Sequence, residues 1–208
     1  IKPGAIVSTN TSGLSIASIA EAFAEGLRAN FLGIHFFNPP RLMKLVEIIP
    51  SPQTDKGVVQ FMKEFVERRL GKGVVLAKDT PNFIANRIGA YSLMVTLRGM
   101  EKWGLAPEEV DALTGPLMGR PKSATFRTLD LVGVDTFMRV VENVKDRVDA
   151  PEEKEVFTLP PFVRQMVAKG WTGDKGGQGF YKKVAGAPLQ VLDLASLTYR
   201  ERRKPVFP

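Results

Sequence analysis

The first 79 residues alternate short β-branched segments with amphipathic helical segments, and this alternation limits the fold more than any other feature of the chain. Strands that alternate with helices of roughly 10 to 15 residues are typical of a sheet covered by helices. Ser15 and Asp55 are suited to begin the two helices, because their side chains can accept hydrogen bonds from the free amides of a helix start. The sequence therefore predicts an α/β piece. Its strands are expected at 5–8, 31–37, 45–49 and 73–77.

Beyond Lys78 the pattern becomes helical. Asp79-Thr80-Pro81 is suited to start a helix. The segment 83–103 then carries Ile84, Ile88, Tyr91 and Val95 on one helical face. A second helix is expected to start at Pro107. Further helices are expected over 124–131, 135–148 and 161–169.

The chain is therefore divided into three parts. Residues 1–79 form the α/β piece, and residues 80–184 form an all-helical domain that ends in a glycine-rich segment. Residues 185–208 are rich in Pro and Arg and are interpreted as an extended tail or linker.

Composition excludes several kinds of site. The chain has no cysteine, so it contains no disulfide scaffold, thiolate zinc site or cysteine nucleophile. Its one histidine, His35, excludes a multi-histidine metal site, and no metal is expected. No apolar run approaches the roughly 20 residues of a membrane span, and no signal peptide opens the sequence. We expect a cytoplasmic protein without a membrane span.

The net charge is +7, which suits an anionic small molecule or a nucleic acid. Most basic residues are scattered along the chain, and the dense cluster at 200–204 is interpreted as part of a solvated tail. No zinc-finger spacing or aromatic RNA-binding motif accompanies that cluster. Nucleic acid is therefore not expected as a partner.

His35 and Glu47 are the residues most suited to chemistry. His35 lies near the carboxyl end of its predicted strand, and ligands of open α/β sheets bind outside those ends. Glu47 shares a strand face with Leu45 and Ile49, where a carboxylate is costly to bury unless it is paired. A carboxylate bonded to one ring nitrogen would fix the tautomer and leave the other nitrogen free to take a proton from an alcohol. By periodicity alone, a core histidine and a solvent-facing glutamate remain possible alternatives.

Four short blocks, in order along the chain, resemble one family. L-3-hydroxyacyl-CoA dehydrogenases carry motifs similar to STNTS at 8–12, HFFNP with MKLVE at 35–47, DTPNFIANR at 79–87 and GQGFY at 177–181. The blocks together span roughly residues 5–183. The resemblance implies a Rossmann-type cofactor domain followed by a helical dimerisation and substrate domain. It also implies the NAD-dependent oxidation of an L-3-hydroxyacyl-CoA in fatty-acid β-oxidation.

The resemblance also implies a role for each matching residue. His35 would be the general base and Glu47 its carboxylate partner, while Asn86 would hydrogen-bond the substrate oxygen. Ser12 would contact both substrate and cofactor. Asn38 and Lys175 would contact NAD. In this family the helical domain usually forms a homodimer, and the apolar stripe in 83–103 is a candidate for that contact.

Some family features are missing or altered. The sequence contains no G-x-G-x-x-G after a strand, and Asn82 stands where the family more commonly has glycine. We therefore expect an inactive fragment that joins the C-terminal half of the cofactor domain to the helical domain. The segment 119–130 resembles long bacterial members in which an enoyl-CoA hydratase unit is fused to the dehydrogenase. The alternative is a non-catalytic module for dimerisation or domain contact within a larger protein.

Overall fold

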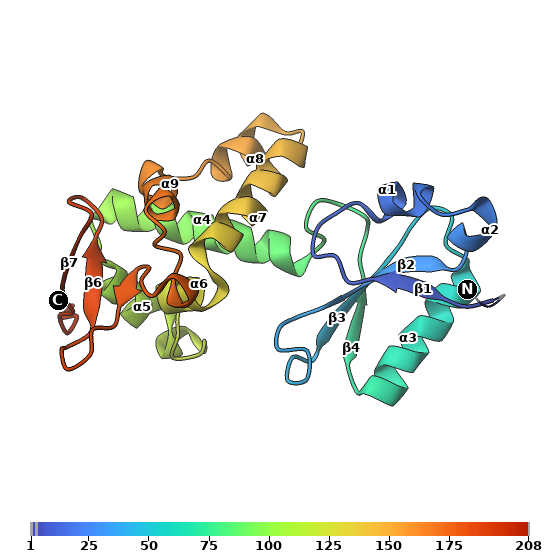
Figure 1. The fold of residues 1–208 in the computed structure, drawn as a ribbon, viewed down its shortest axis with the longest axis horizontal. Helices are drawn as coiled ribbons and strands as arrows, with labels where there is room; N and C mark the ends of the chain where they lie inside the picture. Colours follow the sequence, from blue (N-terminus) through green and yellow to red (C-terminus); the bar gives the residue numbers. More distant parts are fainter. Residues whose placement is uncertain (1, 3, 208) are drawn as a thin grey trace. The chain divides into compact units, whose positions relative to one another are not determined.

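The computed structural model describes residue 2 and residues 4–207, and it divides into two compact units, Ile1–Ile88 and Gly89–Pro208 (Figure 1). Each unit buries its own apolar clusters. Within the described residues, no helix combines the length and the apolar character needed to cross a membrane.

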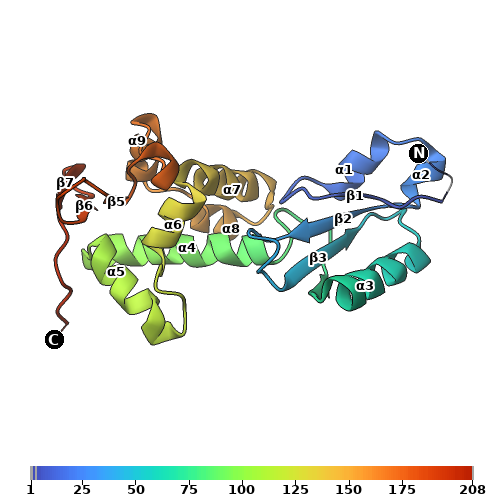
Figure 2. The same ribbon diagram turned by 60° about the horizontal axis from the view of Figure 1, so that its bottom comes forward.

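A four-stranded sheet forms the centre of the first unit. Its strands lie in the order β1 (Val7–Thr9), β2 (Phe31–Phe36), β3 (Leu45–Pro50) and β4 (Gly73–Leu76). The β1–β2 and β3–β4 pairs are parallel, and the central β2–β3 pair is antiparallel. Helices α1 (Ile16–Glu21) and α2 (Glu25–Arg28) lie on one face, and α3 (Lys56–Leu70) lies on the other (Figure 2). The predicted sheet covered by helices is confirmed.

The strand alternation sorts side chains onto these two faces. Phe31 and Ile49 pack with Ile16 of α1. The alternate residues of the same two strands, such as Leu32 and Ile48, pack with Val66 of α3. A Cβ added at Gly33 would lie 2.7 Å from Ile16 Cδ1, so glycine lets α1 approach the sheet closely. The next residue of β2 on the α1 face, after Phe31 and Gly33, is His35.

Both predicted helix caps in this unit are confirmed. Ser15 Oγ accepts a hydrogen bond from the Ser18 amide at 3.2 Å, and Asp55 Oδ1 accepts one from the Gly57 amide at 2.7 Å. Helix α3 ends at Gly71, whose φ of 63° is left-handed and favours glycine.

The second unit is mainly helical, as predicted. Its α-helices are α4 (Ala85–Trp103), which begins in the first unit, α5 (Pro107–Thr114), α6 (Phe126–Val132), α7 (Val134–Arg147), α8 (Pro151–Val156) and α9 (Pro161–Ala168). Short 3₁₀ helices occur at η1 (Pro116–Met118) and η2 (Asp174–Gly176). Met94, Val141 and Met166 come from three different helices and are fully buried in one cluster.

The start of α4 differs from the prediction. The sequence favoured a helix that begins around Asp79-Thr80-Pro81, but α4 begins at Ala85. Asn82 and Phe83 have φ values of 56° and 54°, which are left-handed. A right-handed helix cannot include residues with this backbone conformation, so it starts only after them. The short helix α8 was not predicted.

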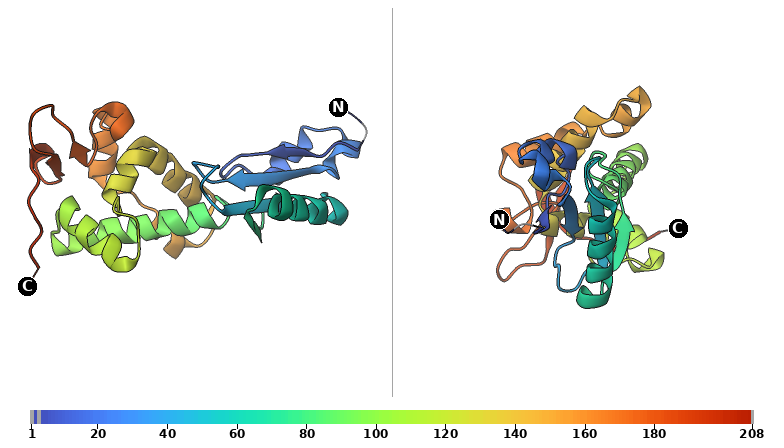
Figure 3. Two further views of the ribbon diagram at one scale, coloured as in Figure 1. Left: turned by 90° about the horizontal axis from the view of Figure 1, so that it is seen from below. Right: turned by 90° about the vertical axis from the view of Figure 1, so that its right-hand side faces the viewer.

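The extended tail predicted for 185–208 is wrong for its middle part. β6 (Gln190–Asp193) and β7 (Thr198–Glu201) form an antiparallel sheet with β5 (Tyr181–Lys182), coloured orange to red in Figure 3. Val191 and Leu192 are 0% exposed because they complete the core of the helical unit. Arg200 forms an ion pair of 2.6 Å with Glu108, so this member of the basic cluster is not a solvated charge.

Candidate active site

His35 and Glu47 face each other across the central strands. They are direct partners in the antiparallel register of β2 and β3. His35 Nδ1 lies 2.7 Å from Glu47 Oε2, and the two residues are 3% and 1% exposed. The pairing that was only suggested by periodicity is therefore present, as a buried hydrogen bond in the first unit.

Glu47 is also bonded to the start of α4. Its Oε1 accepts hydrogen bonds from the amides of Ile84 at 3.0 Å and Ala85 at 2.8 Å. Burial by itself raises the pKa of Glu47, but the hydrogen bonds from His35 and from these two amides outweigh burial and hold the pKa below its usual value. An ionised carboxylate can only accept hydrogen bonds. His35 Nδ1 must therefore be the donor, and in the neutral form of the imidazole this leaves the lone pair on Nε2.

Two aromatic rings line the imidazole. The centroid of Phe37 lies 4.4 Å from that of His35, and the centroid of Phe83 lies 5.7 Å away. These rings hold the orientation of the imidazole on the carboxyl-terminal side of β2.

Ser12 and Asn86 are brought together. Ser12 is exposed in the loop between β1 and α1, and Asn86 is partly buried in the first turn of α4. The Asn86 side-chain amide donates a hydrogen bond to the Ser12 carbonyl at 3.1 Å. The same N-terminal turn of α4 thus contacts both Glu47 and the Ser12 loop.

Asp79 supports this arrangement through the start of α1, and not through a helix start of its own as the sequence predicted. Its carboxylate accepts hydrogen bonds from the Ser15 hydroxyl at 2.9 Å and from the amides of Ile16 at 2.9 Å and Ala17 at 2.8 Å. It therefore fixes the start of α1, directly after the Ser12 loop. The sequence carries no signal for this contact, because the partners are more than 60 residues apart.

Asn38 is exposed in the turn that follows β2. The turn is held from the segment between α3 and β4, because Lys72 Nζ donates hydrogen bonds to the carbonyls of Pro40 at 2.5 Å and Met43 at 2.7 Å. Asn10 Oδ1 accepts a hydrogen bond from the Phe36 amide at 3.0 Å and joins the ends of β1 and β2. Neither Lys72 nor Asn10 was singled out from the sequence.

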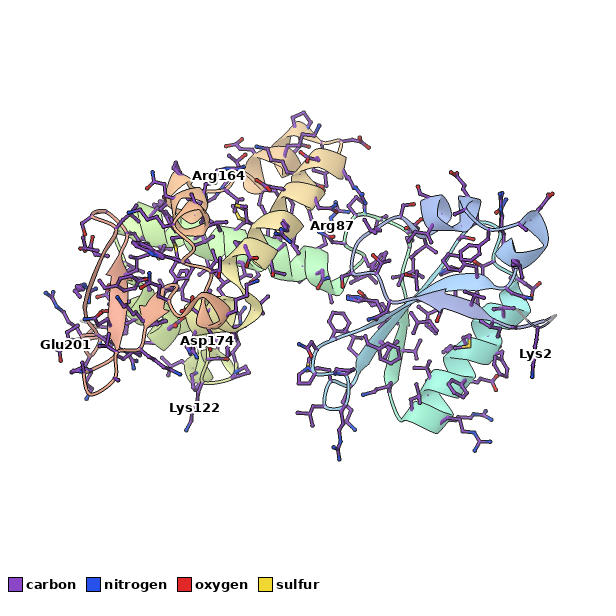
Figure 4. The ribbon with its side chains drawn as sticks, viewed as in Figure 1. Lys2, Arg87, Lys122, Arg164, Asp174 and Glu201 are labelled. Atoms are coloured by element: carbon purple, nitrogen blue, oxygen red, sulfur yellow. The ribbon has the colours of Figure 1, made fainter. Side chains whose placement is uncertain are left out.

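Lys175 belongs to the second unit. Its Nζ lies 2.6 Å from Asp135 Oδ1. The preceding residue, Asp174 (labelled in Figure 4), binds both guanidinium NH₂ groups of Arg127 at 2.6 Å. This lysine is therefore an exposed cation with one carboxylate partner.

The residues at the strand ends fit one part of NAD. β1 and β2 are parallel neighbours, so their carboxyl ends open at the same edge, where nucleotides bind in such sheets. Ser12 and Asn38 follow these two strands and present a hydroxyl and an amide that suit the nicotinamide end of the cofactor. The 208 residues contain no G-x-G-x-x-G, so the fit concerns the nicotinamide end and not the pyrophosphate. Among residues 2 and 4–207, no three metal-ligating side chains gather in one place.

A sheet covered by helices on both faces, with polar residues beyond the carboxyl ends of its parallel strands, is the arrangement of nucleotide-binding α/β domains. The chain matches two models of one family: the NAD binding domain of 3-hydroxyacyl-CoA dehydrogenase over residues 1–80 and the C-terminal domain over residues 83–183. The chain belongs to the 3-hydroxyacyl-CoA dehydrogenase family.

Individual relatives agree with this assignment. A protein of Bacillus subtilis named a probable 3-hydroxyacyl-CoA dehydrogenase is 58% identical over 207 residues, which is 100% of this chain and 26% of the relative. The human mitochondrial hydroxyacyl-coenzyme A dehydrogenase is 38% identical over 85% of this chain and 54% of its own length. The crystal structure of (S)-3-hydroxybutyryl-CoA dehydrogenase PaaH1 from Ralstonia eutropha has a TM-score of 0.76 at 29% identity, covering 86% of this chain and 60% of that one.

The chain thus spans about a quarter of the Bacillus subtilis relative and about half of the human one. The region from β6 onward lies beyond the last residue matched by the family model.

Proposed function

We propose that the protein carrying this chain oxidises the 3-hydroxyl of an L-3-hydroxyacyl-CoA to a ketone, with His35 as the general base. The observation that carries the proposal is the buried hydrogen bond between His35 Nδ1 and Glu47 Oε2. It is supported by membership of the 3-hydroxyacyl-CoA dehydrogenase family.

The proton path follows from the tautomer. The free lone pair on His35 Nε2 takes the proton of the substrate 3-hydroxyl as the ketone forms. Bound NAD supplies the acceptor for the hydride that leaves C3. The imidazolium that results is stabilised by the Glu47 carboxylate, whose charge is in turn held by two amides at the start of α4.

The remaining site residues are proposed to bind and orient. Asn86 donates a hydrogen bond to the substrate oxygen, and Ser12 contacts both substrate and cofactor at the edge beyond β1. Asn38 contacts the nicotinamide side of NAD. Lys175, from the second unit, is proposed as a further cofactor contact on the strength of the motif match alone. Residues 1–79 then act as the C-terminal part of the cofactor domain, and residues 80–184 act as the helical domain.

The decisive test is His35→Gln in the full-length gene product that carries this chain. General-base catalysis contributes on the order of 10²–10⁴-fold, so turnover should fall by that factor while circular dichroism stays unchanged. Lys56→Gln, at an exposed position on α3, is the matched control and should keep wild-type turnover. Retained turnover in His35→Gln would remove the imidazole from the mechanism. A folded wild-type protein that oxidises no hydroxyacyl-CoA would favour the non-catalytic module instead.

We also propose a homodimer through α4. Met94 and Leu97 point into the core of the second unit, whereas Ile88, Tyr91 and Val95 on the same helix are 63%, 51% and 48% exposed. An exposed apolar stripe of this kind is typical of an interface. Ile88→Glu should shift the native mass measured by light scattering from dimer to monomer, and an unchanged mass would exclude this stripe. The cytoplasmic location stays a prediction for cell fractionation.

A further inference from the structure

The segment between β4 and α4 contains a strained turn. Asn82 and Phe83 have φ values of 56° and 54°, which place two consecutive side-chain-bearing residues in the left-handed region. That conformation is costly for L-residues other than glycine, and it persists only where the surrounding contacts impose it. The contacts of these two residues therefore indicate which parts of the site the turn positions.

The C-terminal side of the turn contacts both members of the proposed catalytic pair. Phe83 is 2% exposed, and its ring packs beside the His35 imidazole at a centroid distance of 5.7 Å. The next two amides, of Ile84 and Ala85, bind Glu47 Oε1.

The N-terminal side of the turn contacts the Ser12 loop. Asn82 is 3% exposed, although its side chain is polar. A Cβ added at Gly13 would lie 1.9 Å from Asn82 Oδ1 and 3.0 Å from Asn82 Cγ, so the Asn82 side chain lies directly against the Gly13 backbone. Gly13 follows Ser12 immediately. The space beside Gly13 is thus filled by a side chain that a glycine at position 82 would not provide.

We propose that Asn82 is a positioning residue, which sets the loop that carries Ser12 at a defined distance from His35 and Glu47. The inference rests on the proposed function, because Ser12 is the substrate and cofactor contact in that proposal. Asparagine suits the position for two reasons. It tolerates a left-handed backbone better than other side chains do, and its amide occupies the space against Gly13.

Three variants separate the two properties of this side chain. Asn82→Gly keeps the left-handed backbone accessible and removes the contact with Gly13. Asn82→Asp keeps an oxygen at the Oδ1 position. The control is Ala124→Gly, because Ala124 also has a positive φ, of 48°, and belongs to the second unit, whereas residues 82–85 belong to the first.

The first readout is independent of activity. Hydrogen–deuterium exchange of the peptide covering residues 11–17 should become several-fold faster in Asn82→Gly and stay near wild type in Asn82→Asp. Exchange in residues 45–49 should not change in either variant, because the bonds from Ile84 and Ala85 to Glu47 remain. Ala124→Gly should leave both peptides unchanged. Wild-type exchange of residues 11–17 in Asn82→Gly overturns the proposal.

The second readout is kinetic, in the full-length gene product. Asn82→Gly should raise the KM for the hydroxyacyl-CoA about fivefold, which corresponds to about 1 kcal/mol, and leave kcat and the pH profile near wild type. A simple loss of stability would lower the active fraction and hence kcat without changing KM. An unchanged KM, or an equal rise in Asn82→Asp, overturns the role of the Asn82 side chain. A wild-type protein without dehydrogenase activity overturns the proposed function, and the exchange experiment decides the role of Asn82 separately.

Discussion

Glu47→Gln is the perturbation that examines the site most closely, because it removes a charge and changes almost no volume. Glu47 Oε1 accepts two backbone amides, and Oε2 accepts the proton on His35 Nδ1. A glutamine has only one acceptor oxygen. If its NH₂ group faced the amides of Ile84 and Ala85, two donors would meet two donors. The oxygen of the introduced glutamine must therefore face the start of α4, and its NH₂ group must face His35.

This orientation imposes the wrong tautomer on the imidazole. His35 Nδ1 then has to accept a hydrogen bond, so the ring proton moves to Nε2, which can no longer take a proton from the substrate. The imidazolium also loses the anion beside it. A carboxylate-to-amide change with the same consequence in a serine-protease triad lowers kcat by about 10⁴, so we expect a fall on the order of 10³–10⁴-fold, or about 4–5.5 kcal/mol.

The assay is steady-state turnover of a 3-hydroxyacyl-CoA, followed by the absorbance of reduced nicotinamide, in the full-length gene product. KM should change little, because Glu47 is 1% exposed and is not proposed to contact the substrate. Glu64→Gln on α3 is the control, since its carboxylate is 44% exposed and its contacts are confined to that helix. A Glu47→Gln protein whose kcat stays within about tenfold of wild type would refute the tautomer argument.

Three further predictions concern other parts of the chain. Burial raises the pKa of Asp130 from 3.8 to about 6, against the opposing hydrogen bonds from the Tyr181 and Phe180 amides. The pKa of Asp130 is higher in the folded protein than in the unfolded chain, so protonation of this group stabilises the fold. It contributes about 3 kcal/mol to the free energy of unfolding below pH 4, and this contribution is lost as the pH rises through 6. Urea unfolding at several pH values should show this loss in the wild-type protein and not in Asp130→Asn. The same dependence of the unfolding free energy on pH in both proteins would contradict the prediction. Leu192→Ala should lower the free energy of unfolding by about 2–5 kcal/mol, because Leu192 is 0% exposed. The control is Val206→Ala, which should leave this free energy unchanged because Val206 is 85% exposed. Equal values for the two variants would mean that the C-terminal hairpin does not pack against the helices. Lys72→Met should raise the KM for NAD about fivefold with kcat unchanged, because the turn that carries Asn38 loses two hydrogen bonds, whereas an effect equal to that of Lys56→Met would count against this role.

Local patterns predicted much of the fold because their causes are local. The four strands of the first unit follow from short β-branched runs, and the caps at Ser15 and Asp55 follow from side chains that bond amides within three residues. The helix over 83–103 follows from apolar spacing, but its first turn does not. Phe83 does not favour the left-handed backbone that it adopts, and a single asparagine that tolerates this conformation, Asn82, does not predict it.

The C-terminal hairpin shows a different limit. Residues 190–193 are too short for alternation to be read, and the nearby basic cluster has the composition of a solvated segment. What makes them strands is the space that Val191 and Leu192 fill beside the helices, together with the ion pair between Arg200 and Glu108, 92 residues apart.

The sequence by itself determined which residues are available for chemistry: one imidazole, one carboxylate in an apolar strand, and motifs that match a dehydrogenase family. Tertiary structure alone decided how they act. The register of β2 and β3 sets His35 opposite Glu47, and the start of α4 supplies the two amides that keep Glu47 ionised. Asp79 and Asn82 reach the Ser12 loop across more than 60 residues of chain. Such contacts depend on how segments distant in the sequence pack together, and the local preferences of the chain carry no information about that packing.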